Sequence, residues 1–177
     1  MNYFEFYDLP ISFDLDENLV KKKFYELSKK YHPDFFVNDS EAKQQEILEL
    51  STLNNKAFQV LSNPKKRTEY ILQLQGILIE GEKYQLPQAF LMEMMEVNEA
   101  VMELEFAEGG VAAITISEQV NAIEEALNRE FVHLTTSFES QSESQRAETL
   151  KEVKDLYYRQ KYLLRIRDSL DRFASRN

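Results

Sequence analysis

The sequence contains no cysteine, and this absence excludes several kinds of site. A chain without thiols forms no disulfides and holds neither zinc nor an iron-sulfur cluster through thiolates. Long apolar runs are absent too, and the segment from Met1 to Glu5 has neither the basic start nor the apolar core of a signal peptide. We therefore expect a globular cytoplasmic protein without a membrane segment, a metal site or a bound cofactor.

Basic residues are scarce relative to acidic ones. The chain of 177 residues has 21 Lys and Arg against 31 Asp and Glu, a formal net charge of −10, which argues against a nucleic-acid-binding protein. The excess of acid is uneven, because residues 1–76 contain 10 basic and 12 acidic side chains and residues 77–177 contain 11 and 19. Residues 1–76 are thus near charge balance and can keep a local basic face, whereas residues 77–177 are acidic. Surfaces of opposite sign predict two different partners.

Proline and glycine are also rare, with four of each, and every one falls where the hydrophobic period breaks. They are Pro10, Pro33, Pro64, Pro87, Gly76, Gly81, Gly109 and Gly110. The segments between them have helical periodicity, so we predict an all-α protein. Two glycines in a short segment suggest a boundary there, and we expect one domain over residues 1–75, a linker over 76–86 and a second domain over 87–177.

The first domain has recognisable helix starts and stops. Asp14 or Asp16 can cap a helix that runs to Tyr31, and Ser40 can cap a second long helix that ends near Leu61. Pro64 suits the first turn of a shorter helix that ends near residue 75.

The second domain has the pattern of an antiparallel three-helix bundle. We expect its helices at about Gln88 to Glu108, Ser117 to Glu139 and Ser144 to Arg172. Thr115 and Glu118 have the spacing of a capping box for the second of them.

The helix from Gln88 is apolar on two faces. On a helical wheel with 100° per residue, five apolar side chains point within about 40° of one direction, and we predict that they face the core of the bundle. They are Phe90, Met94, Val97, Val101 and Leu104. A roughly opposite arc carries Leu91, Met92, Met95 and Met102 together with Glu96 and Glu99. A second apolar face indicates burial, dimerisation or a partner, and flexible methionines beside glutamates suit a charge-selective partner surface.

The most informative stretch is Tyr31-His32-Pro33-Asp34. Proline disfavours helix in the residue before it, so the preceding helix should stop and present His32 and Asp34 on a turn. Four lysines lie on the other faces of that helix, namely Lys21, Lys22, Lys29 and Lys30. A general-base pair or a metal site is a weak interpretation of His32 and Asp34, since no third group accompanies them. A simple helix-terminating turn is the other structural interpretation.

This pattern resembles the J domain of the DnaJ class of co-chaperones, an antiparallel helical hairpin with short flanking helices. The resemblance rests on three sequence blocks that occur in the same order as in J domains. They are Tyr3 to Phe6 (YFEF), Phe24 to Asp34 (FYELSKKYHPD) and Ala57 to Arg67 (AFQVLSNPKKR). The rest of the chain lacks the Gly/Phe-rich linker and Cys-rich zinc module of general DnaJ proteins. It looks like the helical C-terminal domain of the HscB family, whose members serve iron-sulfur cluster assembly.

The resemblance implies a co-chaperone that is not itself an enzyme. His32, Pro33 and Asp34, with the four lysines, would bind a DnaK-class ATPase (HscA-like) and stimulate its ATP hydrolysis. The C-terminal domain would bind a cluster scaffold (IscU-like) and deliver it to that chaperone, aiding protein maturation. By position in the family, the scaffold-binding residues would be Leu91, Met92, Met95, Glu96, Glu99 and Tyr158.

Two residues depart from the common J pattern. Phe35 stands where lysine is frequent, and Glu26 adds an acid to the basic helix. We expect Phe35 and Phe36 to pack against the domain core. Two alternatives stay open, a helical docking or regulatory module with a degenerate J domain and no ATPase stimulation, and an enzyme that uses His32 and Asp34.

Overall fold

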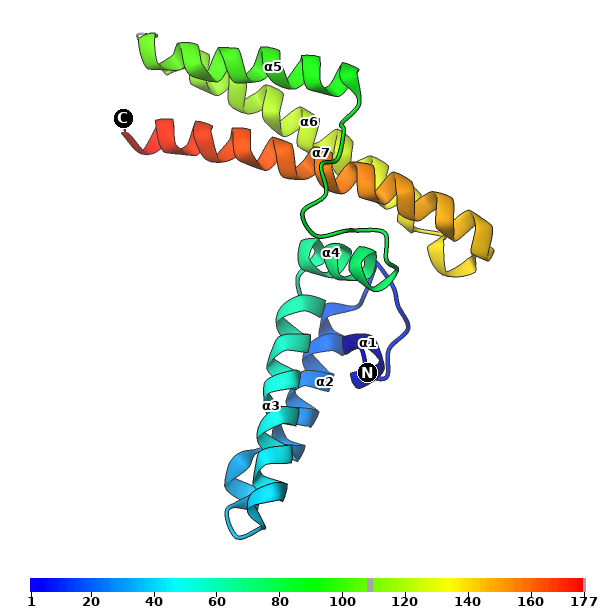
Figure 1. Ribbon diagram of the computed structural model, residues 1–177. Helices are drawn as coiled ribbons and strands as arrows, with labels where there is room; N and C mark the ends of the chain where they lie inside the picture. Colours follow the sequence, from blue (N-terminus) through cyan, green and yellow to red (C-terminus); the bar gives the residue numbers. More distant parts are fainter. Residues whose placement is uncertain (108–109, 177) are drawn as a thin grey trace. The chain divides into compact units, whose positions relative to one another are not determined.

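The structure is a computed structural model that describes residues 1–107 and 110–176. Over these residues the chain is helical and contains no β-strand, which confirms the all-α prediction (Figure 1). Contacts divide the chain at Gly76 into unit 1, residues 1–76, and unit 2, residues 77–177. None of the described helices combines the length and the apolar character that crossing a bilayer requires.

Unit 1 is a helical hairpin with shorter helices around it. Its elements in order are α1 (Tyr3–Phe6), α2 (Glu17–Lys30), the 3₁₀ turn η1 (Pro33–Phe36), α3 (Glu41–Leu61) and α4 (Pro64–Leu74). Figure 1 shows α2 and α3 side by side along most of their lengths, with α4 following the end of α3. The hairpin has one free end, at the α2–α3 connection.

Side-chain caps fix where the helices of unit 1 begin. The carboxylate of Asp16 accepts a hydrogen bond from the backbone N–H of Asn18, and the hydroxyl of Ser40 accepts one from the N–H of Lys43. Both are the side-chain contacts typical of an N-cap. Helix α2 ends before Tyr31, as the following proline predicts.

The core of unit 1 unites residues from all four α-helices and from the loop before α2. Its buried apolar side chains are Phe4, Tyr7, Phe13, Leu15, Val20, Ile47, Ala57, Leu61, Ile71 and Leu72. Arg67 is also buried, and its guanidinium donates to the carbonyls of Phe13 and Leu61. A buried arginine holding two backbone carbonyls therefore ties α4 to the end of α3 and to the loop before α2.

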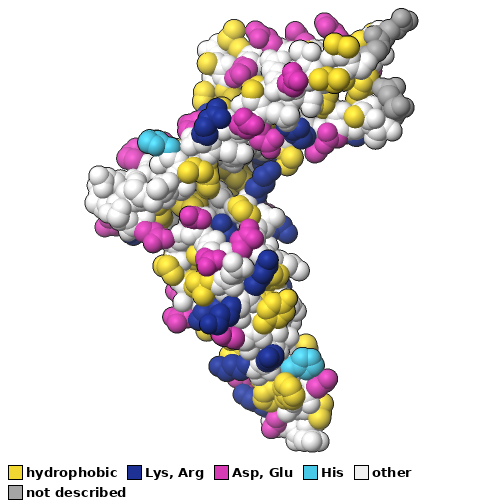
Figure 2. Space-filling model, turned by 180° about the vertical axis from the view of Figure 1, so that it is seen from behind, with side chains coloured by type: hydrophobic (Ala, Val, Ile, Leu, Met, Phe, Trp, Pro, Cys, Tyr) yellow, Lys and Arg dark blue, Asp and Glu magenta, His cyan; other side chains and the backbone are white. Residues whose placement is uncertain are grey.

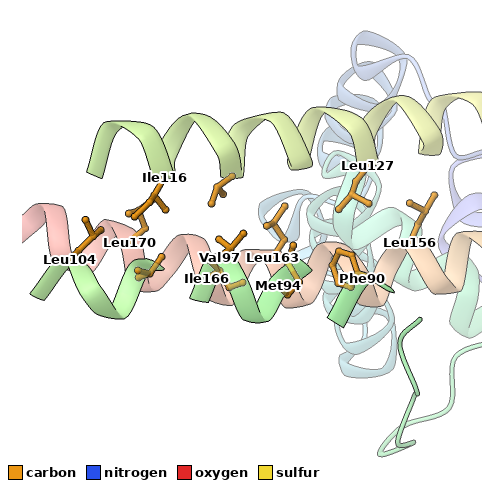
Figure 3. Close-up of a cluster of buried hydrophobic side chains, with 12 residues drawn as sticks. Phe90, Met94, Val97, Leu104, Ile116, Leu127, Leu156, Leu163, Ile166 and Leu170 are labelled. Carbon is orange, nitrogen blue, oxygen red and sulfur yellow. The ribbon is translucent and has the colours of Figure 1, made fainter. Parts of the chain in front are cut away.

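Unit 2 is a three-helix bundle whose middle helix runs opposite to the other two (Figure 1). Its elements are α5 (Gln88–Glu103), η2 (Leu104–Phe106), α6 (Val111–Thr135), η3 (Phe138–Ser140) and α7 (Glu143–Arg176). Figure 3 shows side chains of the three helices meeting in one apolar core. Every residue of the predicted core stripe on α5 belongs to it, since Phe90, Met94, Val97, Val101 and Leu104 are all buried.

The helix boundaries of unit 2 differ from those predicted. Helix α5 ends at Glu103 and passes into η2, and the predicted end at Glu108 lies outside the described residues, as does Gly109. Helix α6 begins at Val111, so the expected capping box is wrong. Thr115 lies inside the helix, where its hydroxyl donates to the carbonyl of Val111 four residues earlier.

Candidate functional site

The turn at the free end of the hairpin is locally rigid. The backbone N–H of Asp34 donates to Nδ1 of His32 (3.3 Å), and the N–H of Phe35 donates to the carbonyl of His32 (3.1 Å). Pro33 occupies the first position of η1, where its fixed φ fits and its missing N–H costs nothing. These three constraints hold the backbone of residues 32–35 in one conformation, and with it the directions in which the side chains leave the turn.

His32 and Asp34 both face solvent. Their side chains are 52% and 85% exposed, and the nearest nitrogen and oxygen are 3.8 Å apart. Within residues 1–107 and 110–176, no three His, Cys, Asp or Glu side chains gather as a metal site would require. His32 and Asp34 thus form an exposed turn whose side chains are open to solvent.

The four predicted lysines on α2 are all exposed, namely Lys21, Lys22, Lys29 and Lys30. The ammonium of Lys30 lies 5.2 Å from the ring centroid of Tyr31. The acidic Glu26 is exposed on the same helix. Lys29 and Lys30 lie in the last turn of α2 and so stand next to the His32–Asp34 turn, whereas Lys21 and Lys22 lie in the first half of the helix.

A buried polar network fixes this hairpin to the rest of unit 1. The phenol of Tyr7 donates to the side-chain oxygen of Asn54, and the amide of Asn54 donates to the carbonyl of Phe24 and the hydroxyl of Ser28. Burial raises the pKa of Tyr7, so the phenol stays a donor. The network joins the end of α1, the middle of α2 and the middle of α3.

Two aromatic side chains, Tyr25 and Phe35, are exposed beside the predicted site residues. Tyr25 is 64% exposed and lies between Lys21 and Lys29 on one face of α2, since residues four apart share a face. Phe35 is 73% exposed, so the expectation that it packs on the core is wrong, whereas Phe36 is half-buried. A 3₁₀ turn advances about 120° per residue, so consecutive phenylalanines cannot both face the core.

The second apolar face of α5 is open to solvent within unit 2. Met92 and Met95 are each 58% exposed, Glu96 and Glu99 are exposed, and Leu91 is half-buried. On the helical wheel these five residues span an arc of about 140° that excludes the buried stripe. We call them the α5 face. A bundle core and a separate apolar surface thus share one helix.

Tyr158 lies on α7 and takes part in a clamp on the segment before α5. Its hydroxyl donates to Glu82 (3.0 Å), and its ring stacks on that of Tyr84 with centroids 4.5 Å apart. Glu82 also forms an ion pair with Lys154 (2.8 Å), which lowers the pKa of that carboxyl. The hydroxyl of Tyr84 donates to Asp155 (2.7 Å). Part of the predicted linker, residues 76–86, is therefore held against α7 by contacts that the sequence pattern did not predict.

The clamp borders the start of α5. One turn after Tyr158 on α7, Tyr162 meets the ring of Phe90 edge to face, with centroids 6.2 Å apart. Gly81 has a φ of +75°, a left-handed conformation that glycine adopts at little cost and that lets the segment turn towards α7. Tyr158 thus contacts the segment before α5 through Glu82 and Tyr84, one helical turn from the α7 residue that contacts Phe90.

Comparison with known families covers most of the chain. The DnaJ domain family matches residues 3–70, and the HSCB C-terminal oligomerisation domain family matches residues 86–171. The co-chaperone protein HscB homolog of Aliivibrio salmonicida is 34% identical over 156 residues, which cover 87% of this chain and 90% of the relative. The homolog of Vibrio cholerae is 43% identical over 100 residues, 56% of this chain, and this stretch spans 58% of the length of the relative.

Two solved structures are similar in fold. One is the chaperone HscB from Vibrio cholerae, with a TM-score of 0.72, 26% identity and 99% of both chains covered. The other is the human co-chaperone protein HscB, with a TM-score of 0.75, 28% identity, and 97% of this chain and 81% of that chain covered.

Proposed function

Because this chain belongs to the HscB family of co-chaperones, we propose that unit 1 binds a DnaK-class ATPase and stimulates its ATP hydrolysis while unit 2 holds an iron-sulfur cluster scaffold. One observation carries the proposal. A single chain presents the rigid, exposed His32–Asp34 turn on a basic helix and, in a separate unit, an exposed methionine face bordered by carboxylates.

The chaperone half of the proposal concerns the turn and the lysines of α2. An HscA-like partner with an acidic groove would be attracted by the exposed lysines, an effect that weakens as salt shortens the screening length. His32, Pro33 and Asp34 would then contact the partner in a geometry that costs little entropy to fix. The hydrolysis takes place in the nucleotide site of the partner, and the co-chaperone shifts that enzyme towards its hydrolysing state.

The scaffold half of the proposal concerns unit 2. Leu91, Met92 and Met95 offer apolar surface to an IscU-like scaffold, while Glu96 and Glu99 favour a basic rim on that scaffold. Tyr158 would contribute from α7, close to the first turn of α5. With no cysteine in the chain, the cluster would travel on the scaffold as cargo.

Joining both surfaces in one chain gives the delivery mechanism. Once the scaffold is bound to unit 2, its encounter with the chaperone on unit 1 becomes intramolecular, and its effective concentration can reach the millimolar range for a short connection. The role follows as scaffold delivery for iron-sulfur cluster assembly.

ATP turnover by the DnaK-class ATPase of the same organism tests the proposal. Adding the full-length protein should raise turnover, and His32→Gln should remove the increase while scaffold binding, measured by titration calorimetry, stays unchanged. Absence of stimulation by the wild-type protein would leave only a docking module. ATP hydrolysis by the isolated protein would instead support the enzyme alternative.

A further inference from the structure

The turn that presents His32 and Asp34 also exposes a pair of apolar side chains. Phe35 is 73% exposed and Val37 is 63% exposed, and we call them the apolar pair. Phe35 is the third residue of η1 and follows Asp34 directly, so it shares the rigid backbone of the turn. Its ring centroid lies 5.6 Å from that of His32.

The exposure of Phe35 follows from the turn, since the same turn half-buries its neighbour Phe36 and directs Phe35 outwards. The backbone hydrogen bonds of the turn fix the direction of the Cα–Cβ bond of Phe35, and a phenylalanine has only two side-chain torsions left to order when it binds. Aromatic side chains, phenylalanine among them, are enriched at the buried centres of protein interfaces. The turn therefore carries a preformed apolar anchor.

The surroundings of the apolar pair indicate what covers it. Figure 2 shows, at the end of the α2–α3 hairpin, a histidine bordered by hydrophobic, acidic and basic side chains. Any protein that contacts His32 and Asp34 while its carboxylates face Lys29 and Lys30 lies within reach of Phe35. The partner that the basic helix attracts is thus the one that meets the apolar pair.

We propose that Phe35, assisted by Val37, inserts into an apolar depression on the DnaK-class ATPase and determines how tightly, and to which such ATPase, this protein binds. The assignment rests on the proposed function of unit 1. In this arrangement, the lysines supply long-range attraction, the His32–Asp34 turn supplies stimulation, and Phe35 supplies most of the short-range affinity. A lysine at this position would instead place a solvated ammonium against the depression and weaken binding.

The test is a titration of the ATPase with full-length variants, measuring ATP turnover against co-chaperone concentration. Phe35→Ala should raise the half-saturating concentration about tenfold and leave the maximal stimulation unchanged, because each tenfold corresponds to about 1.4 kcal/mol and a buried aromatic anchor contributes at least that much. Phe35→Lys should raise it further, and Val37→Ala should raise it by a smaller factor. Leu48→Ala, an exposed apolar residue on α3, is the matched control and should match the wild type.

The outcomes separate this inference from the proposed function. If the wild type stimulates the ATPase but Phe35→Ala and Phe35→Lys have the same half-saturating concentration as the wild type, Phe35 does not anchor the complex. The co-chaperone role would still stand. Lack of stimulation by the wild type overturns both. Sedimentation of the isolated protein gives a further check. If the wild type self-associates as its concentration rises and Phe35→Ala does not, the apolar pair binds a second copy of the chain, and the inference is overturned.

Discussion

The phenol of Tyr7 donates a 2.9 Å hydrogen bond to the side-chain oxygen of Asn54, a contact between buried groups 47 residues apart. Through its own amide, Asn54 then holds the carbonyl of Phe24 (3.1 Å) and the hydroxyl of Ser28 (3.0 Å). One side chain therefore fixes the relative positions of α1, α2 and α3 at the middle of the hairpin that ends in the His32–Asp34 turn.

Replacing Asn54 should destabilise unit 1 strongly. Asn54→Ala removes the side-chain bonds to Tyr7, Phe24 and Ser28, while the phenol of Tyr7 keeps the backbone carbonyl of residue 54 and the carbonyl of Phe24 keeps the hydroxyl of Ser28, so we expect the free energy of unfolding to fall by roughly 1–3 kcal/mol. Asn55→Ala, the exposed neighbour on the same helix, should change it by less than about 0.5 kcal/mol. Urea denaturation followed by circular dichroism measures both, and equal effects would contradict the role given to the network.

Arg67 should behave differently from the basic residue beside it. Arg67 is 4% exposed and binds the carbonyls of Phe13 and Leu61, whereas Lys66 is exposed. Burial lowers the pKa of Arg67, a sign that its charge is partly removed from water. We predict that Arg67→Ala lowers the free energy of unfolding by about 3 kcal/mol, because two buried carbonyls lose their charged donor, and that Lys66→Ala is nearly neutral. Thermal unfolding measures the stability of both variants. Equal unfolding temperatures for Arg67→Ala and Lys66→Ala would contradict the structural role of Arg67.

Met94 and Met95 are adjacent and should separate stability from binding. Met94 is fully buried in the core of unit 2, and Met95 belongs to the α5 face. Met94→Ala should lower the free energy of unfolding by about 2–4 kcal/mol through the lost packing and the cavity that remains. Met95→Ala should change it by less than about 0.5 kcal/mol.

The same two variants should differ in the opposite sense in scaffold binding. Met95→Ala should weaken binding of the scaffold about tenfold in calorimetry, while Met94→Ala, measured at a temperature where it is folded, should retain most of the affinity. If Met95→Ala binds the scaffold as tightly as the wild type does, Met95 does not belong to the proposed binding surface.

Alkaline pH should loosen the clamp before α5. Burial and then the hydrogen bond to Asp155 raise the pKa of Tyr84 to about 12, whereas an unfolded tyrosine ionises near pH 10. The unfolded chain thus releases this proton first, so the stability that neutral Tyr84 contributes is complete below pH 10 and is lost as the pH rises to 12. The free energy of unfolding of the wild type should therefore exceed that of Tyr84→Phe by a margin that shrinks between pH 10 and pH 12. A margin that stays constant over this range would contradict the role given to the hydroxyl of Tyr84.

Local chemistry made much of the fold predictable. Asp16 and Ser40 cap helices because short polar side chains next to a helical stripe bind the free N–H groups of the first turn. Pro33 ends α2 through its steric effect on the residue before it. The core stripe of α5 was predictable because the buried positions recur with the helical period.

Features that depend on tertiary contacts were not predictable. Thr115 has the spacing of a cap, yet Ile116 is buried in the bundle core and α6 extends back to Val111, where Thr115 bonds within the helix. The clamp joins Glu82 to side chains more than 70 residues away, and no local pattern encodes such a pairing. The outward direction of Phe35 depends on a 3₁₀ turn that the sequence pattern did not reveal.

Coupling between the two surfaces is the central claim, and ATP turnover by the DnaK-class ATPase tests it most directly. Turnover should be measured with the full-length protein, with the scaffold alone and with both together. We predict that the protein alone raises turnover, and that the scaffold raises it further only when the protein has an intact α5 face, so that Met92→Ala combined with Met95→Ala abolishes the increment. An increase from the scaffold that is independent of the α5 face, or no increase at all, would contradict the delivery of the scaffold by this protein.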